Sequence, residues 1–461
     1  MILNYKFKEY KRGNRFLLVF PDIPFWLVLK QANKNIIEAF QHSNTIEESL
    51  KYLSKNYDLL ITQNIMNAVI NMYQYLNEKG IVSFVPQRKL EEKWNQKIVS
   101  AGVNITKNCN LNCSYCFADA NHNGLDSKKV ESLTKNDIKK YLDGVKKYAS
   151  DNCAVQFTGG EPLLNRDLFF YGIQYARKIE IPYITVNTNG ILLDDHDIYL
   201  FKKYGVNNVT VSLDGLNADK HDFIRGKGTF SIAKKALLKL KKSGLYVTAC
   251  MTIHADNINE LIPFLKFCYE NNIEGFTAPL FPLGRGAFGK VVPCKLNDIY
   301  LKITTAYTNG DLPAEAIRYS FVQTISTLLN RISRRYYCCT GTSSLFLDID
   351  GSIYPCANTI GPKIFLAGNI KNQTFDSIWI NSKNLKHLRN DINLAEGSCS
   401  NCDLKYLCSG FCRGLNYQVT KSLDNKSIWC EDIHETIING MWFLADHPNI
   451  FSKYEDKFLK M

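Results

Sequence analysis

The sequence predicts an α/β protein centred on a partial (β/α)6 TIM-type barrel, with a winged helix-turn-helix-like domain before it and a cysteine-rich domain after it. Three observations predict this arrangement. Short apolar segments alternate with amphipathic helical ones after residue 96, the first 95 residues combine strand-like and helical runs, and cysteine is dense after residue 337. We expect domains at 1–95, 96–300 and 338–461, with a helical linker over 301–337.

The barrel prediction comes from six strand-like segments with helical or turn-rich stretches between them. One helix is expected over 134–148, with Thr134 as its N-cap, and another over 231–242. Strands that alternate with helices form a parallel sheet or barrel, and six such units are fewer than the eight of a closed barrel. The expected strands are 103–106, 154–158, 183–187, 208–213, 246–253 and 275–279.

The front unit contains expected strands at 16–20 and 25–29, three expected helices, and a wing-like strand at 81–84. The helices are expected near 33–41, from Thr45 onward, where T-I-E-E fits a capping box, and over 62–79, ahead of Gly80. A winged helix often binds DNA. The third helix, however, has one lysine, one glutamate and no arginine, so it lacks the basic side chains that contact phosphates.

The third helix of the front unit is apolar on two faces. One apolar stripe at helical spacing consists of Ile65, Val69, Met72 and Leu76. A second apolar face beside it consists of Met66, Ile70 and Tyr73. Two interpretations stay open. The helix is simply buried, or its second face lines a peptide groove beside an exposed strand edge.

The composition is that of a soluble globular protein, with 461 residues, 45% hydrophobic and 22% charged. No apolar run approaches the roughly 18 residues of a membrane span, and no secretory cleavage pattern is present, so we expect a cytoplasmic protein without a membrane partner. The net charge of +12 suits an anionic partner, but lysine-rich helical runs such as 234–242 account for charge of this kind without one. No nucleic-acid partner is expected.

Fifteen cysteines in a chain without a secretory signal favour metal or redox chemistry over disulfides. Three of them, Cys109, Cys113 and Cys116, lie in K-N-C-N-L-N-C-S-Y-C-F-A-D with the spacing C-x3-C-x2-C. Structural zinc needs a fourth ligand nearby, and a thioredoxin-type pair leaves Cys109 unexplained. An iron–sulfur cubane with one open iron uses all three thiols. They follow the first barrel strand, where functional residues of such barrels lie.

Four further motifs follow in order along the barrel: T-G-G-E-P (158–162), T-N-G (188–190), V-S-L-D-G (211–215) and H-D-F-I-R-G-K-G-T-F (221–230). The glycines allow close backbone approach, and the Glu161 carboxylate suits an ammonium group. Taken alone, G-G-E-P is typical of a turn, and Arg225 of a surface salt bridge.

Together these motifs resemble the radical S-adenosylmethionine (SAM) enzymes. In that family the three cysteines hold a [4Fe–4S] cluster whose open iron binds SAM, and reductive cleavage yields a 5′-deoxyadenosyl radical that abstracts a substrate hydrogen. The resemblance implies that Tyr115 lies near the adenine, that Ser212 reaches the ribose and that Arg225 binds the carboxylate. It also implies a reductant such as flavodoxin or ferredoxin. The remaining implied SAM-binding residues are Gly159, Gly160 and Glu161, which receive the amino group, and Asn189.

Seven cysteines near the end of the chain follow the spacing C-x11-G-x4-C, then C-x2-C-x5-C-x3-C, then C. A zinc ribbon is one alternative for part of them, and we expect this segment to bury little core and to depend on metal for stability. The full series resembles the SPASM domain, which holds two auxiliary [4Fe–4S] clusters and brings the expected total to three. The implied ligands are Cys399, Cys402, Cys408 and Cys430 for one cluster, and Cys339, Cys356 and Cys412 for the inner one.

The inner cluster lacks a fourth cysteine in this series. Cys338, Cys294 and a substrate thiolate are the candidates, and the other cysteines outside the series are expected to be packed thiols. No residue is assigned from the sequence as the catalytic acid or base.

The front unit resembles, in the order of its elements, the PqqD-like domain that binds leader peptides of ribosomally made precursor peptides. With the other resemblances it implies a maturase that takes a precursor peptide with a leader sequence. We expect a thioether crosslink from a cysteine sulfur to carbon, with a carbon–carbon crosslink as the alternative. A sulfatase-maturing enzyme ranks lower because Ala357 stands where those enzymes carry an acidic base. An iron–sulfur winged-helix regulator ranks lower because the SAM motifs are complete.

Overall fold

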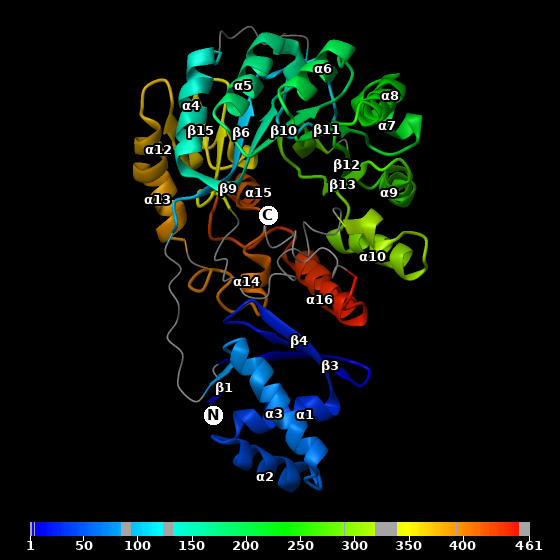
Figure 1. Ribbon diagram of the computed structural model, residues 1–461, viewed down its shortest axis with the longest axis vertical. Helices are drawn as coiled ribbons and strands as arrows, with labels where there is room; N and C mark the ends of the chain where they lie inside the picture. Colours follow the sequence, from blue (N-terminus) through cyan, green and yellow to red (C-terminus); the bar gives the residue numbers. More distant parts are fainter. Residues whose placement is uncertain are drawn as a thin grey trace.

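The computed structural model describes residues 2–3, 5–83, 94–122, 132–289, 291–318, 339–392 and 394–450. Its centre is a nine-stranded mixed sheet in the order β13-β12-β11-β10-β9-β6-β14-β15-β16 (Figure 1). Six of these strands pair in parallel in chain order, which confirms the predicted βα repeat. They are β6 (Ile98–Asn104), β9 (Ala149–Thr158), β10 (Tyr183–Thr188), β11 (Asn208–Ser212), β12 (Val247–Ile253) and β13 (Glu274–Pro279).

The two faces of the parallel strands differ. Alternate residues such as Val155, Phe157 and Val209 are fully buried and pack into one core with the helices around the sheet. The residues between them, such as Gln156 and Thr210, are half-buried and largely polar, so the interior face of the sheet is hydrophilic. The helices are α4 (Lys135–Tyr148), α5 (Arg166–Lys178), α6 (Asp195–Lys203), α7 (Ala218–Arg225), α8 (Thr229–Lys242), α9 (Leu261–Glu270) and α10 (Leu296–Thr308).

Local sequence explains how α4 starts and packs. Thr134 is its N-cap, as predicted, and forms a capping box with Asp137, whose carboxylate accepts from the Thr134 N–H. Gly144 leaves room for the ring of Phe375, because a Cβ at Gly144 would lie 2.0 Å from that ring. Phe375 begins α12 (Phe375–Asn381), so this glycine lets α4 pack against the C-terminal part of the chain.

The cysteine-rich segment is better packed than the sequence indicated. Its strand β14 (Ser344–Leu347) pairs in parallel with β6, and β15 (Ser352–Tyr354) and β16 (Gly368–Asn369) follow antiparallel. Phe365, Trp379 and Leu385 are fully buried in the same core as the barrel strands. The expectation that this segment buries little core was therefore wrong. Its other helices are α13 (Lys383–Asn390), α14 (Lys405–Cys408), α15 (Arg413–Thr420) and α16 (Cys430–Asp446).

Part of the expected helical linker is seen. The α10 helix packs against α16, and the Asp432 carboxylate of α16 accepts from the N–H groups of Leu296 and Asn297 at 2.6 and 3.0 Å. Residues 319–338, including Cys338, lie outside the described residues.

The front domain has a three-stranded antiparallel sheet, β2-β3-β4, and three helices (Figure 1). The predicted strands and helices are confirmed, but β2 was missed because its sequence, K-E-Y-K-R, carries four charges and no aliphatic residue. The expected wing strand is short and pairs with β1 at the start of the chain. The elements are β1 (Ile2–Leu3), β2 (Lys8–Arg12), β3 (Arg15–Phe20), β4 (Phe25–Lys30), α1 (Gln31–Gln41), α2 (Ile46–Tyr57), α3 (Gln63–Glu78) and β5 (Val82–Ser83).

The front sheet buries both of its faces. Leu18 and Phe20 face the front helices, whereas Leu17, Val19 and Trp26 belong to the main core. Figure 1 shows this sheet lying next to α14 and α16.

Polar contacts hold the front sheet to the C-terminal part. The Tyr10 hydroxyl donates to Asp403, whose other oxygen lies 3.1 Å from His434 Nε2. Arg15 Nη1 lies 2.5 Å from Asp446 Oδ1. The front domain is thus joined to the segment that carries Cys402 and Cys408. Among the described residues, no helix is both long and apolar enough to span a membrane.

Candidate functional site

The predicted motifs meet at one edge of the sheet. Parallel strands end at the same edge, and β6, β9, β10 and β11 are followed by the three-cysteine loop, T-G-G-E-P, T-N-G and V-S-L-D-G respectively. The site is built from this edge.

The three-cysteine loop is held from outside by the segment after β13. Arg285, on a 3₁₀ helix (Gly284–Phe288), donates from its backbone N–H to the Cys116 carbonyl and from Nε to the Cys113 carbonyl, both at 3.0 Å. Its Nη1 donates to the Ala120 carbonyl at 2.7 Å. Sequence reasoning missed Arg285, and its G-R-G setting after the last barrel strand is the signal that could have found it.

The two glycines of T-G-G-E-P permit close approach to the cysteine loop itself. Gly160 N–H donates to the Thr106 carbonyl at 2.7 Å, and a Cβ on Gly160 would lie 2.1 Å from the Asn108 carbonyl oxygen. A Cβ on Gly159, whose φ is +150°, would lie 2.5 Å from the Thr106 oxygen. No side chain fits at either position, so these glycines fix where the loop begins.

Glu161 is fully buried and ties the second motif to the third. Its carboxylate accepts from the Thr188 hydroxyl at 2.7 Å, the Asn189 N–H at 2.8 Å and the Leu163 N–H at 3.2 Å. Burial raises the pKa of Glu161 to about 7, although these donors act in the opposite direction. The structure thus gives Glu161 a bracing contact that the sequence did not predict.

Asn189 reaches from the third motif to the cysteine loop. Its Nδ2 donates to Asn110 Oδ1 at 2.8 Å and lies 3.8 Å from the sulfur of Cys109. Asn189 therefore lies directly beside a predicted cluster ligand.

Tyr115, Asp214 and Arg225 form a buried triad beside the cysteines. Tyr115 donates to Asp214 at 2.6 Å, and Arg225 donates to Asp214 at 2.7 Å and to the tyrosine hydroxyl. Burial by itself raises the pKa of the Asp214 carboxyl, but Arg225 more than offsets this, so the pKa lies below its usual range. Asp214 belongs to V-S-L-D-G but was not among the predicted site residues. Ser212, two residues earlier, is half-buried at the end of β11.

The outer auxiliary cysteines share one electrostatic neighbourhood. Burial, together with Cys402, Cys399 and Cys430, raises the pKa of Cys408 to about 12. These four predicted ligands are therefore near enough for their thiols to act on one another electrostatically.

Hydrogen bonds of Ser344 and Asn358 connect the segments that carry the inner cysteines. Ser344 Oγ lies 2.9 and 2.6 Å from the carbonyl oxygens of Cys339 and Pro355 and can donate to either, which joins Cys339 to the residue before Cys356. Asn358 Nδ2 lies 3.6 Å from the sulfur of Cys412.

Cys294 lies among different groups. The charged side chains that act on its thiol are Asp298, Asp256 and Lys302, and burial raises its pKa to about 11.

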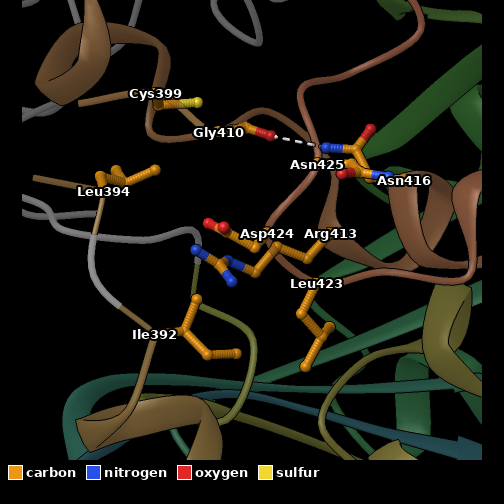
Figure 2. A pocket seen from close by; sticks show the side chains of 9 residues that line it. All are labelled: Ile392, Leu394, Cys399, Gly410, Arg413, Asn416, Leu423, Asp424 and Asn425. Carbon is orange, nitrogen blue, oxygen red and sulfur yellow. Dashed lines mark hydrogen bonds between the residues drawn. The ribbon is translucent and has the colours of Figure 1, made fainter. Parts of the chain in front are cut away.

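A small cavity lies beside Cys399 of the outer set (Figure 2). It measures about 20 Å³, little more than one water, and is lined by Cys399, the buried guanidinium of Arg413 and the Asp424 carboxylate. Arg413 follows Cys412 in the sequence and lines this cavity together with Cys399, so its cation lies near a thiol of the outer set.

The donor sets fit iron–sulfur clusters. Burial, together with the neighbours Cys113, Glu161 and Cys116, raises the pKa of Cys109 to about 11, so this thiol stays protonated at neutral pH without a cation beside it. Iron supplies such a cation, and thiolate ligands bind it with loss of their protons. Among the described residues, no three His, Cys, Asp or Glu side chains are close enough to enclose a single ion.

Family models match both parts of the site. The radical SAM superfamily model matches residues 103–268, and the SPASM model, an iron-sulfur cluster-binding domain, matches residues 338–403. The chain carries a radical SAM domain and a SPASM domain. The radical SAM match covers the three-cysteine loop and the four further motifs, and the SPASM match begins at residue 338 and includes β14.

Curated proteins that are similar to this chain vary in activity. An AdoMet-dependent heme synthase from Methanosarcina barkeri is 27% identical over 71% of this chain and 94% of its own length. The radical SAM cyclopropyl synthase TigE from Paramaledivibacter caminithermalis is 24% identical, over 80% and 83%.

Solved structures share the fold. anSMEcpe with bound AdoMet has a TM-score of 0.59 and 21% identity, and covers 76% of this chain and 99% of its own. Streptococcus suis SuiB bound to S-adenosylmethionine has a TM-score of 0.56 and 16% identity, and covers 94% and 100%. The SuiB match thus spans more of this chain than the anSMEcpe match.

Proposed function

We propose that this protein is a peptide maturase that installs a thioether crosslink in a ribosomally made precursor peptide, with a carbon–carbon crosslink as the alternative. The observation that carries the proposal is the front domain, which packs its sheet against the SPASM segment instead of standing apart. SuiB, which shares the fold over 94% of this chain, has been solved bound to its precursor peptide SuiA. A leader-binding domain fixed beside the redox domain suits a peptide substrate.

The proposed leader site lies between β4 and α3. Within the described residues β4 is an edge strand, so its outer N–H and C=O groups are available for an added peptide strand. On α3, Val69 and Leu76 are buried against the front core, whereas Met66 and Ile70 stay half-exposed and outside that core. This second apolar face suits the side chains of a bound leader.

The radical SAM residues orient the reaction. When bound, the cluster and SAM supply the 5′-deoxyadenosyl radical that abstracts a substrate hydrogen. We propose that Arg225, held by Asp214, binds the cofactor carboxylate and that Tyr115 packs near its adenine. Ser212 reaches the ribose, and the Gly159–Gly160–Glu161 turn receives the amino group together with Asn189.

Incubation of the reduced, reconstituted protein with SAM and its genetically neighbouring precursor peptide, under anaerobic conditions, tests the proposal. We expect 5′-deoxyadenosine and a peptide that has lost two hydrogen atoms. Absence of 5′-deoxyadenosine would sink the enzyme assignment, and a porphyrin product in place of a modified peptide would reassign the substrate.

Alkylation separates the two crosslinks. A thioether consumes a cysteine thiol, so the product takes up one fewer iodoacetamide group than the untreated precursor. A carbon–carbon crosslink leaves every thiol free to react. Tandem mass spectrometry then locates the bond.

A further inference from the structure

The strand β14 brings an acidic residue to the edge of the sheet where the cofactor motifs meet. It lies parallel to β6, with Leu347 opposite Val103. Because parallel strands end at the same edge, Asp348, the residue after β14, lies level with the start of the three-cysteine loop. Nothing in the local sequence indicates this position, since residue 348 is remote from the barrel motifs along the chain.

The Asp348 side chain faces the interior of the sheet. Phe346 lies opposite Gly102, and a Cβ on Gly102 would lie 2.1 Å from the Phe346 ring, so these two residues share a face. Asn104 and Asp348 are two residues further along each strand and therefore share that face too. Asn104 Nδ2 donates to Asp348 Oδ1 at 2.9 Å, which agrees with this orientation.

The neighbouring turn does not use the Asp348 carboxylate in any hydrogen bond that the structure describes. In the turn from β14 to β15, Gly351 N–H donates to the Asp348 backbone carbonyl at 3.0 Å. The carboxylate that caps the turn is that of Asp350, which accepts from the Ser352 N–H at 2.8 Å and its hydroxyl at 3.0 Å. The role expected of a turn aspartate is thus filled by Asp350.

Two carboxylates beside the cofactor motifs, those of Glu161 and Asp214, are already engaged in hydrogen bonds or an ion pair. Glu161 is fully buried and accepts three hydrogen bonds, and Asp214 is fully buried and paired with Arg225. Asp348 differs because it is half-buried and its described side-chain bond engages one oxygen only. It is a carboxylate at this edge that can meet a substrate.

We propose that Asp348 contacts the substrate and takes the proton of its cysteine thiol during crosslinking, an inference that rests on the proposed function. As the carbon–sulfur bond forms, the S–H and C–H bonds break. The carbon's hydrogen leaves as an atom to the 5′-deoxyadenosyl radical, the thiol proton passes to Asp348, and the one remaining electron passes to an oxidised iron–sulfur cluster. Asn104 is the positioning residue that aims the carboxylate.

The described side chains around Asp348 are uncharged or engaged with other groups, so the Asp348 carboxylate remains to act as the base. On its own hairpin, Asp350 caps the turn and Tyr354 is close enough for both carboxylates to act on its hydroxyl. On β6, Asn104 is uncharged. Across the turn, Lys371 packs against Gly351, and its ammonium group donates to the Ser132 carbonyl at 3.4 Å.

The test compares the full-length Asp348→Asn protein with wild type and with the matched control Asp350→Asn. Asparagine keeps an acceptor for Asn104. We expect Asp348→Asn to form 5′-deoxyadenosine normally but to crosslink about 100-fold more slowly, at the lower end of general-base effects. Its crosslinking rate should rise with pH toward the thiol pKa of about 8.5, whereas the wild-type rate is already flat near neutrality. The Asp350→Asn protein should keep the wild-type pH profile.

The remaining possible results contradict either the role of Asp348 or the proposed function. Equal crosslinking rates and pH profiles for wild type and Asp348→Asn would overturn the inference. So would a parallel loss of 5′-deoxyadenosine and crosslink with an unchanged profile, which indicates a structural role. If wild type cleaves SAM but never crosslinks its precursor, the proposed function itself fails and the role of Asp348 fails with it.

Discussion

Removal of Arg225 should leave a buried carboxylate without its counter-ion. Asp214 is fully buried, and Arg225 Nε lies 2.7 Å from its Oδ2. Loss of one partner of a buried pair costs about 3–5 kcal/mol. Because Tyr115 and the Thr252 N–H still donate to Asp214, at 2.6 and 3.0 Å, we expect Arg225→Met to lower the free energy of unfolding by about 3 kcal/mol.

The loss of stability in the Arg225→Met protein should depend on pH. The pKa of Asp214 determines whether this loss grows or shrinks as pH rises. In the wild type this pKa lies below its usual range, so the pair contributes stability above the unfolded pKa of about 3.9, and the contribution is lost as pH falls through the folded pKa. Without Arg225, burial dominates and the folded pKa rises above the unfolded one. The variant then loses stability as pH rises, so the difference from wild type should be larger at pH 7.5 than at pH 5.

Urea unfolding of the cluster-free proteins under reducing conditions measures both effects. The exposed neighbour Lys227, changed to Met, serves as the control for loss of a positive charge, and surface substitutions of this kind change stability by about 0.5 kcal/mol or less. A double variant with Asp214→Asn should recover part of the loss. An Arg225→Met protein as stable as the control, or a difference that does not grow with pH, would refute the reasoning.

Three further predictions follow from the site. Cys113→Ala should abolish 5′-deoxyadenosine formation and lower the iron content by one cluster, and retention of either would contradict the ligand assignment. On the proposed leader site, Ile70→Glu should weaken precursor binding by about tenfold or more, as burial of a charge against an apolar partner implies, without changing cofactor cleavage in the absence of peptide. Asn67→Glu, at an exposed polar position of the same helix, is the control, and equal affinities measured by fluorescence anisotropy would argue against leader docking there. Gly160→Ala should lower the free energy of unfolding by about 1–3 kcal/mol, because the added methyl group would collide with the Asn108 carbonyl. Unchanged urea unfolding would show that the three-cysteine loop shifts to make room for the methyl group.

Most of the barrel could be predicted from the sequence, and the cysteine spacings predict the cluster ligands. Strand alternation and helix caps are local patterns, so β9 to β13 and the N-cap Thr134 could be predicted from residues a few positions apart. The cysteine spacings and the motifs at strand ends are local too. Because parallel strands end together, their order along the chain already indicated one shared site.

How distant segments complete that site follows from the packing of the folded chain and could not be predicted from the sequence. Arg285 reaches the Cys113 carbonyl, Asp348 meets Asn104, and Tyr10 meets Asp403, although 172, 244 and 393 positions separate the partners. No local periodicity encodes such contacts, since each depends on how whole elements pack. The β14 strand is the clearest case: a serine followed by three apolar residues in a cysteine-rich stretch carries no sign of its partner strand, and burial beside β6 is what places an acidic residue at the sheet edge.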